Sequence, residues 1–137
     1  MKRILTLALL LGVVLLASSC RKEVTQVIQP NQTVVFPVTA ASWQYDEARN
    51  TWYVNLDMPE IDSYIQENGG VLVYMNREGD GYEQVPFLYD QITYSYVTFT
   101  GGIQLVAQYY DADASTAPEP PRPASSTIKV VIIDSVP

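Results

Sequence analysis

The chain has 137 residues, of which fifteen are acidic and eight basic, so its formal net charge is −7. An acidic surface repels phosphate backbones, and this argues against nucleic-acid binding. Histidine is absent, which excludes Ser-His and Cys-His catalytic pairs and histidine metal ligands, so acid–base chemistry would rest on carboxylates, tyrosine or lysine.

The first twenty residues have the pattern of a secretory signal peptide. Lys2 and Arg3 precede an uncharged apolar run over residues 4–17, and small residues then lead into Cys20, the only cysteine. A helix of that length spans about 21 Å, too little for a bilayer core of about 30 Å. We therefore expect residues 1–19 to be removed.

Residues 16–20, Leu-Ala-Ser-Ser-Cys, resemble a bacterial lipobox, with Ala17 at the position where leucine is commonest. The resemblance implies that Cys20 carries lipid and anchors the mature chain to a bilayer. A thiolate is the nucleophile that takes up such a group, and lasting attachment needs more than one acyl chain. The alternative is an ordinary signal peptide that ends beside a chance cysteine.

The remaining 118 residues have the length of one domain, and six basic residues against fifteen acidic ones give them a net charge of −9. We read residues 20–32 as the lipidated cysteine with a polar tether, and residues 33–137 as the domain. Arg21 follows the anchor, which fits the outer membrane under the enterobacterial sorting rule. Exposure at the surface and exposure to the periplasm both stay open.

From residue 33 onward, short apolar alternations and turn signals predict β-strands. The predicted strands cover residues 33–40, 43–45, 52–58, 71–76, 82–89, 92–99, 103–110 and 127–134. The pattern of residues 59–67 indicates one or two helical turns. The prolines of residues 114–126 indicate a loop, and Pro37 indicates that the first strand lies at an edge of its sheet. Residues 130–133 are entirely apolar, so we expect the last strand to be covered on both sides.

Seven or eight short strands predict an all-β fold, namely an antiparallel immunoglobulin-like β-sandwich. An open barrel is the alternative. From about residue 43 the chain resembles small lipoproteins of Bacteroidota, and this resemblance implies no particular activity. The residues that carry it are Trp43, Trp52 and Tyr53, and residues 70–74, 85–87 and 128–133.

Four aromatic residues fall in one predicted hairpin: Trp43, Tyr45, Trp52 and Tyr53. If exposed, they would form a platform for a sugar ring or a peptide, because aromatic rings offer an apolar face and tyrosine adds a polar tip. The other interpretation, which we favour, is that strand aromatics fill the sandwich core.

Two weaker patterns concern a metal and a modification. Asp111, Asp113 and Glu119 supply oxygen atoms of the kind that Ca²⁺ prefers, but their spacing does not match a calcium-binding loop, and solvated loop acids are the simpler interpretation. Asp134-Ser135-Val136 resembles the O-glycosylation site of Bacteroidota, with Ser135 as acceptor. We expect no cofactor.

These patterns together predict an outer-membrane lipoprotein with a non-catalytic binding or structural module at the cell envelope, whose ligand is a glycan or a protein. One alternative is a carboxylate-dependent enzyme that acts on glycans. Another is a periplasm-facing assembly partner of an envelope complex. No spacing brings two carboxylates together on a cleft, so we expect no enzyme activity.

Overall fold

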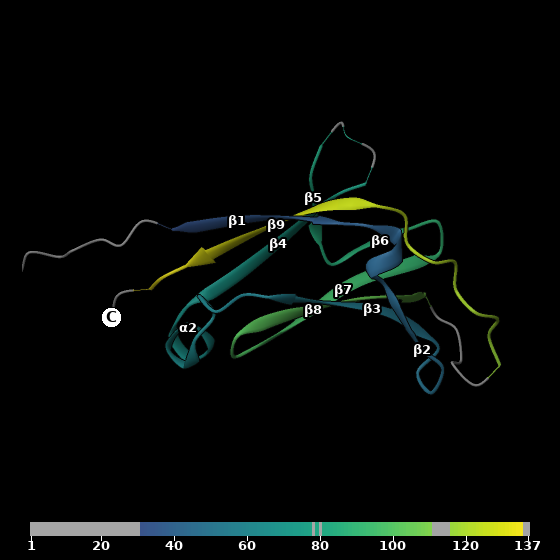
Figure 1. The fold of residues 1–137 in the computed structure, drawn as a ribbon, viewed down its shortest axis with the longest axis horizontal. Coiled ribbons are helices and arrows are strands. Elements are labelled where there is room, and N and C mark those ends of the chain that lie inside the picture. The colour runs from purple at the N-terminus through teal and green to yellow at the C-terminus, as the bar shows by residue number, and fades with distance from the viewer. Residues whose placement is uncertain (1–30, 78, 80, 111–115, 136–137) are drawn as a thin grey trace, which may run out of the picture.

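The structure, a computed structural model, describes residues 31–77, 79, 81–110 and 116–135. The predicted signal peptide and Cys20 lie outside these ranges. The described residues form nine strands in two antiparallel sheets that face each other (Figure 1). The predicted antiparallel β-sandwich is confirmed, with nine strands in place of seven or eight. Among the described residues, no helix has the length and apolar character that a membrane crossing requires.

The four-stranded sheet has the order β1–β9–β4–β5. Its strands are β1 (Gln32–Val38), β4 (Gly70–Asn76), β5 (Glu83–Val85) and β9 (Ser126–Ile133). Because β9 lies in the middle, Val130 is paired with Val34 of β1 on one side and with Val73 of β4 on the other. β1 forms an edge of the sheet, as predicted from Pro37.

The five-stranded sheet has the order β2–β3–β8–β7–β6. Its strands are β2 (Gln44–Asp46), β3 (Thr51–Asp57), β6 (Phe87–Tyr89), β7 (Ile92–Phe99) and β8 (Gly102–Tyr109). Two short helices lie in the connections, η1 (Ala40–Ser42) and α2 (Ser63–Asn68). The carboxylate of Asp62 accepts a hydrogen bond from the Ile65 N–H at 2.9 Å and so caps α2.

Alternation along the strands places the core between the two sheets. In β3, Trp52, Val54 and Leu56 are buried, whereas Asn55 and Asp57 are exposed, as the period of two predicts. Other strands supply Val73, Ile103, Leu105, Ala107, Ile128, Val130 and Ile132. Burying one large aliphatic side chain contributes about 1.5–3 kcal/mol, and a chain with one cysteine forms no internal disulfide to add to this.

Pro86 divides the strand that the sequence predicts over residues 82–89. β5 ends at Val85 and pairs with β4, while β6 begins at Phe87 and pairs with β7 in the other sheet. Proline has no N–H to donate to a ladder, so it interrupts the pairing of a strand. The chain therefore passes from one sheet to the other at Pro86.

The outer side of β9 corrects the expectation that this strand is covered on both sides. Val131 and Ile133 are only half-buried, so the described part of the chain leaves that face partly open. The apolar run is explained by the central position of β9, because its backbone pairs with β1 and β4 on both edges. Paired edges prevent the edge-to-edge association that an apolar strand would otherwise invite.

A tyrosine hydroxyl joins the two sheets. Tyr96 of β7 donates a hydrogen bond to the carbonyl oxygen of Val71 in β4 at 2.7 Å. The short strand β5 pairs only with Val73, Tyr74 and Met75 of β4, so it does not reach the level of Val71. The side chain from the opposite sheet thus supplies a partner where the neighbouring strand has ended.

Replacing Tyr96 with phenylalanine should lower the free energy of unfolding by about 1 kcal/mol, because the half-buried Val71 carbonyl loses its protein partner. Denaturant unfolding measures the change. Tyr53→Phe is the matched control, since its hydroxyl bonds the Gln44 side chain at the surface, where water replaces it at a cost below about 0.5 kcal/mol. Equal losses in the two variants would contradict the cross-sheet role.

Two buried tyrosines should make the fold sensitive to alkali. Burial raises the pKa of the Tyr94 and Tyr96 hydroxyls above the ordinary value of 10.0, and for Tyr94 the nearby Arg77 acts against that shift. The unfolded chain therefore releases these protons at lower pH than the native one. The contribution of the two tyrosines to stability is thus constant below about pH 9 and falls as pH rises past about 10. Thermal unfolding between pH 8 and 11 tests this. Tyr94→Phe should flatten the alkaline decline, whereas Tyr110→Phe, at an exposed position, should not.

Candidate binding groove

The four aromatic residues of the β2–β3 hairpin do not form an exposed platform. Trp43 and Trp52 are only 2% and 4% exposed and belong to the core, which corrects that hypothesis. Tyr45 pairs with Trp52 and faces the same way, with ring centroids 5.2 Å apart. Tyr53 is the next residue of β3 and points to the opposite side, because side chains alternate along a strand.

The buried side of the hairpin holds the proline-rich loop in place. The Trp52 indole N–H donates to the Pro120 carbonyl oxygen at 2.8 Å. The Asn50 amide donates to the carbonyl oxygens of Ala117 and Pro118, each at 3.1 Å. Residues 116–125 are therefore a loop, as predicted. Its carbonyl oxygens have no neighbouring strand to pair with, and side chains of the hairpin donate hydrogen bonds to three of them.

The predicted metal ligands are only partly within the described residues. Asp111 and Asp113 lie outside them, as does Cys20, while Glu119 is exposed on the proline-rich loop. Desolvation raises the pKa of the Tyr45 hydroxyl, and the negative charge of Glu119 adds to this, so Glu119 lies near the hairpin. No cluster of three residues suited to a metal occurs in the described ranges.

Ser135, the candidate acceptor for a glycan, lies at the end of the described chain beyond β9. Its hydroxyl donates to the Asn68 carbonyl oxygen, and its own carbonyl accepts from the Tyr64 hydroxyl at 3.0 Å. Ser135 is exposed, but in this arrangement its hydroxyl is engaged with the end of α2.

An open hollow lies on the outer face of the five-stranded sheet. It is an open groove of about 990 Å³ that runs along β3 and β8 to the β2–β3 turn. Strand register places Asn55 beside Gln104 and Gln104 beside Val97. The next outward row places Tyr53 beside Val106. Amide, aromatic and aliphatic side chains therefore line one surface in successive rows.

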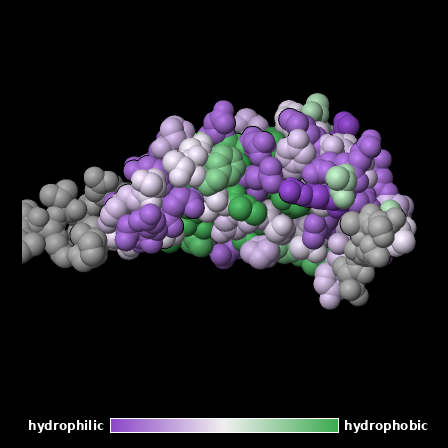
Figure 2. Space-filling model, turned by 90° about the horizontal axis from the view of Figure 1, so that it is seen from below, coloured by the Kyte–Doolittle hydropathy of each residue, from purple (hydrophilic) through white to green (hydrophobic). Residues whose placement is uncertain are grey.

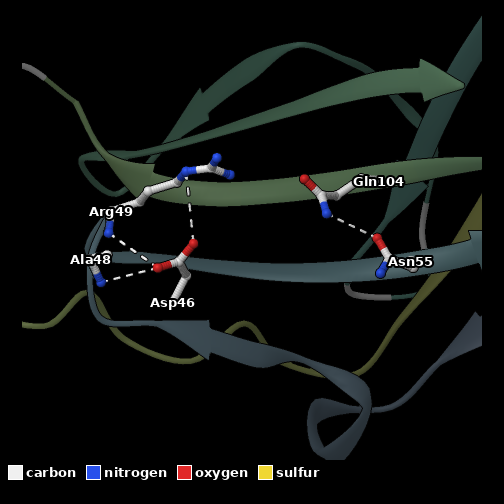
Figure 3. A network of polar contacts seen from close by, with 5 residues as sticks. All are labelled: Asp46, Ala48, Arg49, Asn55 and Gln104. Carbon is white, nitrogen blue, oxygen red and sulfur yellow. Dashed lines mark hydrogen bonds and ion pairs between the residues drawn. The ribbon is translucent and has the colours of Figure 1, made fainter.

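Two amides form the polar centre of the groove. The Gln104 Nε2 donates to the Asn55 Oδ1 at 3.0 Å (Figure 3). This bond uses one donor of Gln104 and one lone pair of Asn55, so the Asn55 NH₂ group and the Gln104 carbonyl oxygen retain hydrogen-bonding capacity. Their mutual bond fixes both side chains, which gives a ligand an acceptor and a donor at set positions.

The acidic end of the groove is tied to its own turn. The Asp46 carboxylate accepts from the backbone N–H groups of Ala48 and Arg49 at 3.0 and 3.2 Å, and it pairs with the Arg49 side chain at 3.8 Å (Figure 3). Such bonds are typical of an Asx turn. They hold the β2–β3 turn at the end of the groove, so the Asp46 carboxylate stabilises the turn.

An apolar strip completes the surface. Val97 is 60% exposed and Phe99 44% exposed, and both point outward from β7. Figure 2 shows hydrophobic side chains near the middle of the face seen from below, with hydrophilic ones around and between them. Large exposed apolar side chains beside fixed amides are typical of a binding surface.

Sequence reasoning missed the amide pair because its signal is split between two strands. Gln104 alternates with the buried Ile103 and Leu105, so its outward direction can be read from β8 alone. Its neighbour Asn55 is 49 residues away, and only the register of β3 with β8 brings them together.

Comparison with known proteins does not identify a ligand for the groove. No protein-family model, no curated protein and no solved structure matches this chain. A fold by itself does not determine a function, so the function has to be argued from the side chains of the groove.

Proposed function

We propose that this chain is a lipid-anchored protein of the cell envelope whose β-sandwich is a non-catalytic module that binds a neutral glycan. The anchor is supported by the signal pattern and by the lone Cys20 at its end. The binding role is supported by the groove on the five-stranded sheet. The single observation that carries it is the Asn55–Gln104 pair beside Tyr53 on an open, outward face.

A glycan fits the chemistry of this surface better than a charged ligand does. Sugar hydroxyls both donate and accept hydrogen bonds, and the two amides offer both functions. The C–H faces of sugar rings are apolar and match the Tyr53 ring and the aliphatic side chains of Val97 and Val106. The groove is open along its length, which suits a chain of sugar rings.

Hydrolysis is not supported by the same surface. Glycoside hydrolases need two carboxyl groups on opposite sides of the scissile bond, about 5–10 Å apart. The carboxylates that line the groove are Asp46 and Glu47, which are neighbours in one turn at one end. Asp46 is also held by its own turn, so this pair does not flank a bound sugar.

The position of the groove agrees with an anchor that precedes the domain. The chain enters β1 at one end of the sandwich, and the β2–β3 turn lies at the other end (Figure 1). A bilayer anchor at Cys20 would therefore leave the turn end of the groove directed away from the membrane. Polar residues between Cys20 and β1 act as the tether.

Glycan binding should be lost when the groove is altered. Tyr53→Ala and Gln104→Ala should each weaken binding about tenfold, since each removes roughly 1–1.5 kcal/mol of contact. Affinity electrophoresis of the purified domain on a panel of neutral polysaccharides measures this. Gln84→Ala is the matched control, because Gln84 is an exposed amide on the other sheet. Failure of the unaltered protein to bind any of the panel, or turnover of a glycan, would contradict the proposal.

The anchor has a separate test. Cys20→Ala should abolish labelling by a fatty-acid probe and leave the precursor uncleaved or the protein released from membranes, because the acceptor thiol is gone. Gel fluorescence after metabolic labelling reads the first effect and fractionation reads the second. Cys20→Ser is the conservative variant and should behave in the same way. Labelling that persists in either variant would refute lipidation at this residue.

A further inference from the structure

A smaller hollow lies between the proline-rich loop and the β6–β7 hairpin, away from the groove. Its volume is about 190 Å³, and its lining includes two arginines, Arg77 and Arg122. We infer that this hollow binds a single carboxylate carried by a small apolar body. The proposal is independent of the glycan groove, because the two lining sets share no residue.

Arg77 is a fixed wall of the hollow. Its side chain is only 18% exposed and pairs with Glu83 at 2.5 Å. The guanidinium stacks on the Tyr89 ring at 3.5 Å and reaches the Phe87 ring at 5.2 Å, contacts that hold a planar cation in one orientation. Its Nε atom is buried and has no hydrogen-bond partner among the described residues. Among the described residues this donor is left unsatisfied, and Arg77 is part of the lining of the hollow.

Arg122, which is exposed, supplies the second positive charge in the lining of the hollow. Its guanidinium lies over the Trp52 ring at 4.5 Å. The ion pairs within the described ranges are Arg49 with Asp46 and Arg77 with Glu83, so Arg122 forms none with a described acid. A stacked guanidinium keeps its edge free, and this edge matches a carboxylate with two parallel hydrogen bonds.

The other titratable groups of the hollow limit the charge of the ligand. Asp90 is in the lining and is exposed, and Glu83 pairs with Arg77 beside it. These two carboxylates would repel a dianion such as phosphate more strongly than a monoanion. Tyr94 also lines the hollow, and a tyrosine hydroxyl is a neutral donor at neutral pH that does not oppose an anion.

The rest of the lining is apolar. Met75 and Ile92 form the inner wall, and Pro121 and Pro123 of the proline-rich loop form the outer one. An apolar body of a few carbon atoms fits between these walls while its carboxylate reaches the arginines. Two sources carry that chemistry, namely the C-terminal residue of a peptide and a free branched acid.

The test uses titration calorimetry on the purified mature protein with three probes: N-acetyl-alanyl-leucine, its C-terminal amide, and isovalerate. We expect the free acids to bind and the amide not to bind. Tighter binding of the peptide acid assigns the site to peptide termini, and tighter binding of isovalerate assigns it to small acids. Equal binding of the acid and the amide, or no binding of either acid, would overturn the inference.

Variants locate the binding. Arg122→Gln should raise the dissociation constant about tenfold or more, since it removes a charge-assisted pair. Arg122→Lys should give a smaller loss, because it keeps the charge without the planar fork. Lys129→Gln is the control for net charge, because Lys129 lies against the Tyr74 and Tyr82 rings and is not in the lining of the hollow. The Lys129→Gln protein should bind as tightly as the unaltered protein. Circular dichroism checks that each variant folds. An Arg122→Gln protein that folds and binds like the unaltered one would refute the assignment.

Discussion

The arrangement of the two proposed binding surfaces depends on the way the β2–β3 hairpin holds the proline-rich loop. Asn50 adopts a left-handed backbone conformation with φ of 52° and is only 8% exposed, so its side chain turns inward. It accepts a hydrogen bond from the Tyr45 hydroxyl at 2.7 Å and donates two to the loop, which leaves the buried amide fully paired. Trp52 adds the bond to Pro120. Without an internal disulfide or a ladder, these side-chain contacts determine where the loop lies.

The same alternation along the strands builds both the core and the groove. The inward residues of β3 and β8 bury apolar side chains in the core. The outward residues that alternate with them, such as Asn55 and Gln104, can be substituted without leaving a cavity in the core. Changes to the binding surface therefore carry little cost in stability, since surface substitutions usually change it by less than about 0.5 kcal/mol. The hydrogen-bonded pairing of neighbouring strands fixes the spacing of the outward rows, so the geometry of the groove follows from the fold.

The strands and their inward faces could be predicted from the sequence because a period of two is visible within each segment, as in residues 52–58. Alternation does not tell which strands are neighbours, so the Asn55–Gln104 contact and the hollow beside Arg77 could not be found. It also does not tell which face of a strand is covered. That is why Val131 is half-exposed against expectation, and why the exposure of Trp43 stayed open. Pro86 lies within residues 82–89, which the sequence predicts as one strand, whereas in the structure its missing N–H coincides with a change of sheet.

The scarcity of positive charge makes the partner of each cation informative. Arg49 is paired with the turn that closes the groove, Arg77 is paired and stacked at the junction of the sheets, and Lys129 lies against two tyrosine rings. Each of these has a structural contact that accounts for it. Among the described residues, Arg122 lies over the Trp52 ring and forms no ion pair, and stacking satisfies the face of a guanidinium but not its N–H edge. Within the described residues no carboxylate forms an ion pair with that edge, and the proposed carboxylate site rests on this feature.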